Sequence, residues 1–114
     1  MNANFDQIYD TAQECSAQLV AAVKQSGVKV LLENHIGTLE ISDRINYRVL
    51  IMPCDPWARD ITMRATDEDR DCTVHEILQV TATAISKLQE LTREGRIKFL
   101  REELAKLEAE EAER

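Results

Sequence analysis

An apolar series with helical spacing fills the C-terminal third of the chain, and it constrains the fold more than any other feature. Thr73 and Glu76 have the spacing of a capping box, which predicts that a helix begins near Val74. Two sets of positions then recur at alternating steps of three and four residues. The first set is Ile77, Thr81, Ala84, Leu88 and Leu91, and the second is Ile97, Leu100, Leu104, Leu107 and Glu111. The two sets are out of phase, and Gly95 lies between them.

One unbroken helix through both sets is longer than a domain of this size. At about 1.5 Å per residue, a helix from Val74 to Ala112 spans about 60 Å. A domain of 114 residues is only about 35 Å across. Two alternatives follow: the helix breaks near Gly95 and folds back on the domain, or it projects from the domain.

A projecting helix needs a partner for its apolar positions. We expect Leu100, Leu104 and Leu107 to form an oligomer interface, because a second copy of the same chain is the simplest molecule that could cover them. In the fold-back alternative, the same leucines pack on their own domain. The glutamates that follow Leu107 are typical of a solvated helix end.

The N-terminal part of the chain predicts a second amphipathic helix, over residues 4–26. Its apolar stripe is Phe5, Ile8, Ala12, Cys15, Leu19 and Ala22. Gly27 follows at the position where a left-handed residue commonly ends a helix.

After Gly27 the apolar period changes from 3.6 to 2, which indicates strands. We expect a hairpin of residues 28–33 and 39–41, a third strand over 45–51 that ends before Pro53, and a fourth within 59–66. The expected fold is therefore α+β: an N-terminal helix packed on a three- to four-stranded antiparallel meander, followed by a long or Gly-broken C-terminal helical segment. Residues 1–73 hold the first helix and the sheet. Residues 74–114 form the C-terminal helical part of the same single domain.

Composition excludes several classes of partner. The net charge of −7 argues against binding to a DNA backbone. No apolar run approaches the roughly 20 residues that a bilayer span needs, and the N-terminus lacks the basic and apolar regions of a signal peptide. The cysteines Cys15, Cys54 and Cys72 are odd in number and have no metal-site spacing. This pattern favours reduced thiols in the cytoplasm.

The residues that could support catalysis are few. Isolated glycines exclude a phosphate-binding loop. His35 and His75 are far apart in sequence, and Cys54 has no neighbouring base. We therefore expect a protein that is not an enzyme and that uses no cofactor and no metal.

Arginines and the single tryptophan supply the candidate ligand-binding residues. Arg48 and Arg64 should share the outward face of the sheet, where Asp60 could pair with Arg48. Trp57 lies in a loop stiffened by Pro53 and Pro56.

A second basic group surrounds Gly95 and includes Arg93 and Arg96. Pairs along the helix such as Lys98 with Glu102 could neutralise this group. Both arginine groups are compatible with a solvated surface or with a site for a phosphorylated ligand, which guanidinium groups bind well.

Two functions are compatible with these observations. The first is an oligomeric interaction protein that binds a macromolecular partner, as an adaptor or an inhibitor. Small acidic proteins of this kind are common among bacterial and phage accessory products, including inhibitors of host defence, although this is an analogy of size and composition. The alternative is an oligomeric binder, or sponge, of a phosphorylated small molecule such as a nucleotide signal.

Overall fold

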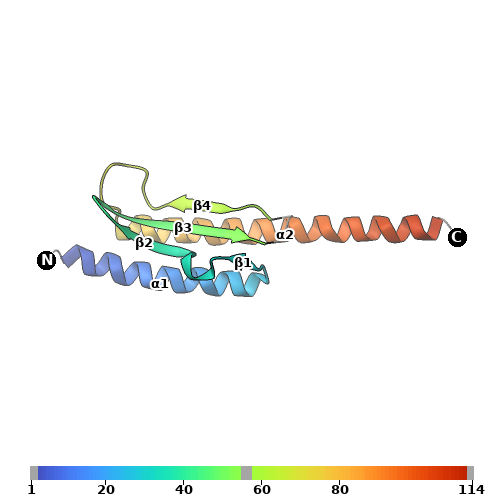
Figure 1. The fold of residues 1–114 in the computed structure, drawn as a ribbon, viewed down its shortest axis with the longest axis horizontal. Coiled ribbons are helices and arrows are strands. Elements are labelled where there is room, and N and C mark those ends of the chain that lie inside the picture. The colour runs from blue at the N-terminus through green and yellow to red at the C-terminus, as the bar shows by residue number, and fades with distance from the viewer. Residues whose placement is uncertain (1–2, 55–57, 113–114) are drawn as a thin grey trace.

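Two helices lie side by side on one face of an antiparallel sheet in the computed structural model of the chain (Figure 1). The structure describes residues 3–54 and 58–112. Its elements are α1 (Ala3–Ser26), β1 (Val30–Leu31), the 3-10 helix η1 (Glu33–His35), β2 (Gly37–Ile41), β3 (Ile45–Pro53), β4 (Ile61–Arg64) and α2 (Val74–Ala112). The expected α+β fold is confirmed.

Strand β3 is the centre of the sheet, and β1, β2 and β4 all pair with it in antiparallel orientation. Strands β2, β3 and β4 form the expected meander. The predicted hairpin of residues 28–33 and 39–41 is wrong, because β1 and β2, among the described strands, pair with β3 and not with each other.

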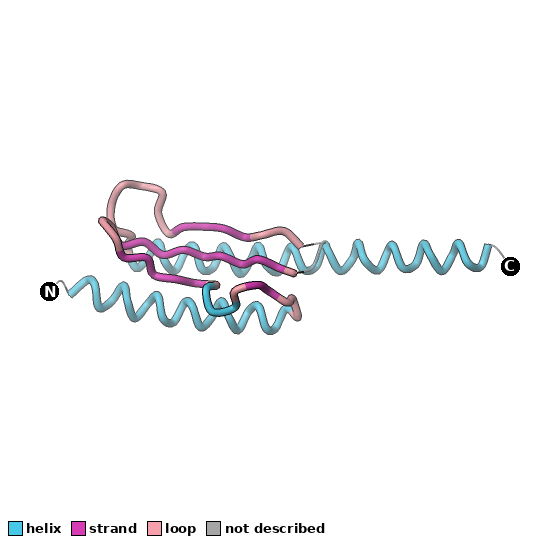
Figure 2. Tube along the Cα trace, viewed as in Figure 1, coloured by secondary structure: helices cyan, strands magenta, loops and turns pink. Residues whose placement is uncertain are grey.

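The connection between β1 and β2 explains this difference. Leu32 adopts a left-handed conformation (φ 54°) and leads into η1, so the chain makes a local detour instead of a hairpin turn. The amide of Leu50 then donates to the carbonyl of Ile36 (2.8 Å), and the amide of Cys54 donates to that of Lys29 (2.8 Å). The detour therefore lets both segments follow β3 (Figure 2).

The core lies between the sheet and the two helices. Alternate residues of β3, namely Tyr47, Val49 and Ile51, are fully buried because successive side chains of a strand point to opposite faces. The predicted stripe of α1 supplies Ile8, Ala12, Cys15 and Leu19, and the first half of α2 supplies Ile77, Val80, Ala84 and Leu88. Both helices thus bury one face, as their periodicity predicted.

The hydroxyl of Tyr47 is satisfied inside this core. It lies 3.0 Å from the hydroxyl of Ser16, which donates to the carbonyl of Gly37 (2.8 Å). Burial raises the pKa of Tyr47 to about 12. Gly37 permits this arrangement, since a Cβ atom there would collide with the Tyr47 hydroxyl.

Helix α2 begins with the predicted capping box. The amide of Glu76 donates to the Thr73 hydroxyl (3.2 Å), and the amide of Thr73 donates to the Glu76 carboxylate (3.0 Å). Arg70 binds the same carboxylate through two nitrogens (2.8 and 2.9 Å). The guanidinium of Arg70 lowers the pKa of Glu76 to about 2.

Gly95 does not break α2, which runs continuously from Val74 to Ala112. The fold-back alternative is therefore wrong. A glycine keeps its backbone N–H and costs a helix only about 0.5–1 kcal/mol relative to alanine, so it does not end a helix by itself. The second half of α2 extends past the sheet and α1, and the molecule measures 74 × 24 × 21 Å (Figure 1).

Candidate interaction surfaces

The projecting half of α2 consists of residues 96–112, and every one of these residues is exposed. The three leucines predicted to form an oligomer interface are all on its surface. Leu100 is 59% exposed, Leu104 56% and Leu107 58%. Their own domain therefore leaves these side chains largely in contact with solvent.

The exposed leucines lie on a different side of α2 from its buried residues. An α-helix turns by about 100° per residue, so Ile97, Leu100, Leu104 and Leu107 centre about 160° away from the line of Ile77 and Gly95. The buried residues of α2 end at Gly95. The phase shift in the sequence thus marks the change from a surface that faces the sheet to a surface that faces away from it. We call this second surface, Ile97 to Leu107, the leucine stripe.

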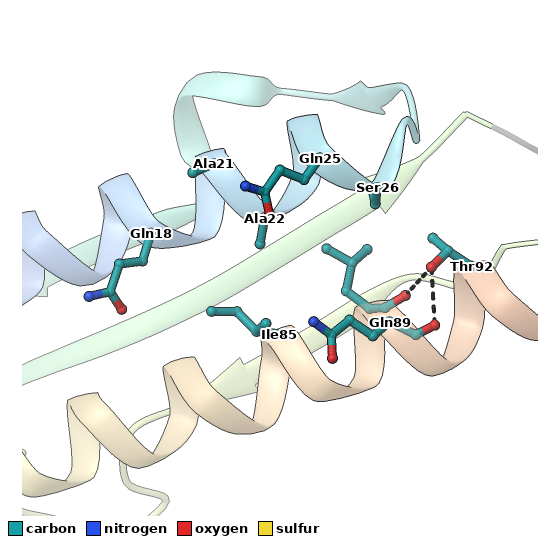
Figure 3. Close-up of a pocket in the computed structure, with 9 residues that line it drawn as sticks. Gln18, Ala21, Ala22, Gln25, Ser26, Ile85, Gln89 and Thr92 are labelled. Carbon is teal, nitrogen blue, oxygen red and sulfur yellow. Dashed lines mark hydrogen bonds between the residues drawn. The ribbon is translucent and has the colours of Figure 1, made fainter.

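A shallow groove separates α1 and α2 on the side away from the sheet. Its volume is about 600 Å³, and both polar and apolar side chains line it (Figure 3). They are Gln18, Ala21, Ala22, Gln25 and Ser26 at α1, and Ile85, Leu88, Gln89 and Thr92 at α2. The Thr92 hydroxyl donates to the carbonyls of Leu88 (2.9 Å) and Gln89 (3.1 Å) of its own helix. The sequence did not predict this groove, because periodicity does not show which helices pack together.

The groove continues to the leucine stripe. A second hollow of about 410 Å³ begins at Gln25, Ser26 and Thr92, which also line the first. It then passes Arg93, Arg96, Ile97 and Leu100. Two predicted ligand residues, Arg93 and Arg96, therefore lie where the groove meets the stripe.

Arg48 and Arg64 form a separate group on the outer face of the sheet. They are opposite each other in the pairing of β3 with β4, and Glu40 of β2 lies 3.5 Å from Arg48. Glu40 is therefore the acidic partner of Arg48, and the predicted pair of Arg48 with Asp60 is wrong. The register of β3 with β4 places Arg64, and not Asp60, opposite Arg48. The Nε atom of Arg48 is buried and has no hydrogen-bond partner within the described residues.

The structure does not join the predicted ligand residues into one pocket. Arg48 and Arg64 lie on the sheet face opposite to the helices, whereas Arg93 and Arg96 lie on the outer side of the helix layer. Trp57 lies outside the described residues. The two arginine pairs therefore belong to two separate surfaces.

The ionic pairs along the projecting half differ from the predicted one. Lys106 lies 3.6 Å from Glu103, and the expected pair of Lys98 with Glu102 is not formed in the described structure. Basic side chains near Gly95 thus remain available to another molecule.

Cysteine and histidine side chains are dispersed over the fold. Cys15 and Cys72 are buried and Cys54 is exposed, and burial raises the pKa of the Cys72 thiol. His35 is the last residue of η1, and His75 lies in the first turn of α2. Both side chains are exposed. Within residues 3–54 and 58–112 no three His, Cys, Asp or Glu side chains come together as a metal site.

The described helices include none with both the length and the apolar character required to cross a membrane. No protein-family model, curated protein or solved structure matches this chain.

Proposed function

We propose that this chain is a non-enzymatic interaction protein of the cytoplasm that self-associates through the leucine stripe and binds a macromolecular partner, as an adaptor or an inhibitor. The observation that carries the proposal is the projecting half of α2, which presents regularly spaced leucines to solvent. Helices in water gain most of their stability from packing an amphipathic face, and this half has no such packing in the single chain.

Covering the stripe would release a useful amount of free energy. Full burial of one leucine side chain contributes about 1.5–3 kcal/mol, and these leucines still expose more than half of their surface. A dimer covers the stripe of both copies, so the gain is several kcal/mol per dimer. Association costs about 4–15 kcal/mol in lost freedom. This balance favours reversible assembly over an obligate one.

Self-association leaves the outer face of the sheet free for a partner. This face combines Arg48, Arg64 and Glu40 with Leu31, which is 56% exposed, and with Met52 opposite it. Each copy in an oligomer would carry one such face. Mixed apolar and arginine surfaces are typical of protein interfaces.

Light scattering of the full chain at about 50 μM tests the assembly. We expect a mass of at least twice 13.0 kDa for the wild type, and a monomer for Leu104→Lys. Phe99→Lys is the matched control, because Phe99 is 52% exposed on the same segment but about 120° from the centre of the stripe. We expect the control to assemble like the wild type. A wild-type mass of 13 kDa would refute the proposal.

A phosphorylated ligand is the second candidate, and the position of Arg48 opposite Arg64 on the outer face of the sheet is the observation that favours it. An anion between these two side chains would accept hydrogen bonds from both guanidinium groups. A thermal-shift screen with inorganic phosphate and nucleotides tests this candidate, since a ligand that binds only the folded state raises its stability. No shift with any of these anions would exclude them as ligands.

A further inference from the structure

We infer that two copies of the chain pair in antiparallel orientation along the projecting halves of α2. This inference rests on the self-association proposed above and adds the orientation of the partner. Three features support it: the distribution of charge along the projecting half, the residues of its last turn, and the position of the groove between α1 and α2.

Charge changes sign along the exposed part of α2. Residues 93–101 contain four basic side chains, Arg93, Arg96, Lys98 and Arg101, and one acid, Glu94. Residues 102–112 contain five glutamates and one base, Lys106. Lys106 with Glu103 is the ion pair found between these charges in the described structure.

Orientation decides which of these segments meet. In a parallel pair, the basic segments of the two copies lie together and so do the acidic ones, which is repulsive. In an antiparallel pair, the acidic end of each copy lies along the basic segment of the other. Charges at such positions commonly set the orientation of paired helices.

The last turn of α2 gives an independent reason. The C-terminal end of a helix carries a partial negative charge, which basic residues normally offset. The last turn of α2 has no basic residue and holds Glu110 and Glu111. In the antiparallel pair, the basic segment of the second copy lies beside this turn, where the described residues include no base.

The groove between α1 and α2 gives a third reason, because it lies in line with the leucine stripe. The leucine stripe and the hollow at Gln25, Ser26, Thr92 and Arg96 are continuous. A second helix that runs antiparallel along the stripe continues toward this hollow, so the acidic end of one copy approaches Arg93 and Arg96 of the other. A parallel helix would bring Arg93 and Arg96 of the second copy to this hollow, and not its acidic end.

Distances between spin labels on the two copies of the full chain test the orientation. Cys54 is exposed and would accept a label, whereas Cys15 and Cys72 are buried, so the background variant is Cys54→Ser. One protein then carries Glu103→Cys and another Glu110→Cys. The two positions lie seven residues apart on the same side of the helix, and both changes remove one glutamate.

In an antiparallel pair, moving the label from residue 103 to residue 110 separates the labels along both helices. At about 1.5 Å per residue, the distance between labels should rise by roughly 15–20 Å. In a parallel pair the two labelled proteins should give the same distance. Equal distances would overturn the antiparallel orientation and leave self-association intact. A monomeric mass with no coupling between labels would instead overturn the self-association on which the inference rests.

Discussion

The two halves of α2 have similar apolar spacing but opposite surroundings. In the first half, Ile77, Ala84 and Leu88 are almost completely buried against the sheet and α1. In the projecting half, Leu100, Leu104 and Leu107 have the same spacing and lie on the surface. Periodicity therefore shows which side of a helix is apolar, but not which molecule covers that side.

The two ends of α2 differ in their polar contacts as well. Thr73, Glu76 and Arg70 form a closed set of hydrogen bonds at the first turn. The last turn has glutamates where favourable interaction with the helix dipole calls for basic residues. The start of the helix is thus stabilised within the chain, whereas its last described turn contains no basic residue.

Shortening one leucine in each half should give the largest contrast. Leu88 is 2% exposed, and Leu88→Ala should lower the free energy of unfolding by about 2–5 kcal/mol because it leaves a cavity. Leu104→Ala should change the unfolding of the monomer by no more than about 0.5 kcal/mol and should weaken self-association. Urea denaturation at low protein concentration checks both values. If both variants lowered the free energy of unfolding of the monomer equally, Leu104 would be packed as closely as Leu88, which would contradict its exposure.

Close packing in the body of the molecule gives the next largest effect. Gly37→Ala should destabilise the fold by about 1–3 kcal/mol, because the added methyl group displaces the Tyr47 hydroxyl from Ser16. Ala105→Gly in the projecting half is a useful comparison, since it alters an exposed helix and should cost at most about 1 kcal/mol. Thermal unfolding of both variants measures the difference. A fully stable Gly37→Ala protein would contradict the described packing of Tyr47.

Acid should destabilise the start of α2. The pKa of Glu76 is about 2 in the folded chain, below its ordinary value of 4.5. Its contribution to stability is therefore complete above pH 4.5 and is lost as the pH falls from 4.5 toward 2. Glu76→Gln should flatten this part of the profile of unfolding free energy against pH. Glu110→Gln, at the other end, should leave the Glu76 contribution unchanged. An unaltered acid profile in Glu76→Gln would refute the role of the Arg70 contact.

The smallest effect is expected on the outer face of the sheet. If Arg48 is only a solvated surface residue, Arg48→Ala should change the free energy of unfolding by no more than about 0.5 kcal/mol and should not affect assembly. If Arg48 binds a phosphate with Arg64, the same change should weaken binding of that anion by roughly 10- to 150-fold, which is about 1.5–3 kcal/mol. Calorimetric titration of wild type and variant with an anion selected by thermal shift distinguishes the two roles.

Much of the fold was predictable from local patterns. The capping box at Thr73 and Glu76, the stripe of α1 and the left-handed residue at Gly27 (φ 74°) are all present. Each depends on residues close in sequence. The pairing of β1 with β3 was not predictable, because the left-handed Leu32 redirects the chain and leucine rarely adopts that conformation.

The candidate surfaces were predictable only in part. The leucine stripe follows from periodicity, and the buried residues of α2 end at Gly95, where the two apolar sets change phase. The groove between α1 and α2 depends on packing between distant segments, as does the choice of Glu40 as the partner of Arg48. Such features require the three-dimensional arrangement of the elements.

Hydrogen exchange at two protein concentrations tests most directly whether a second copy covers the projecting half of α2. Backbone amides of residues 96–112 should exchange quickly at about 0.5 μM and should become protected at about 50 μM, because association buries the stripe. Amides of residues 77–92 should be protected equally at both concentrations. Exchange of residues 96–112 that is equally fast at both concentrations would contradict self-association through this segment.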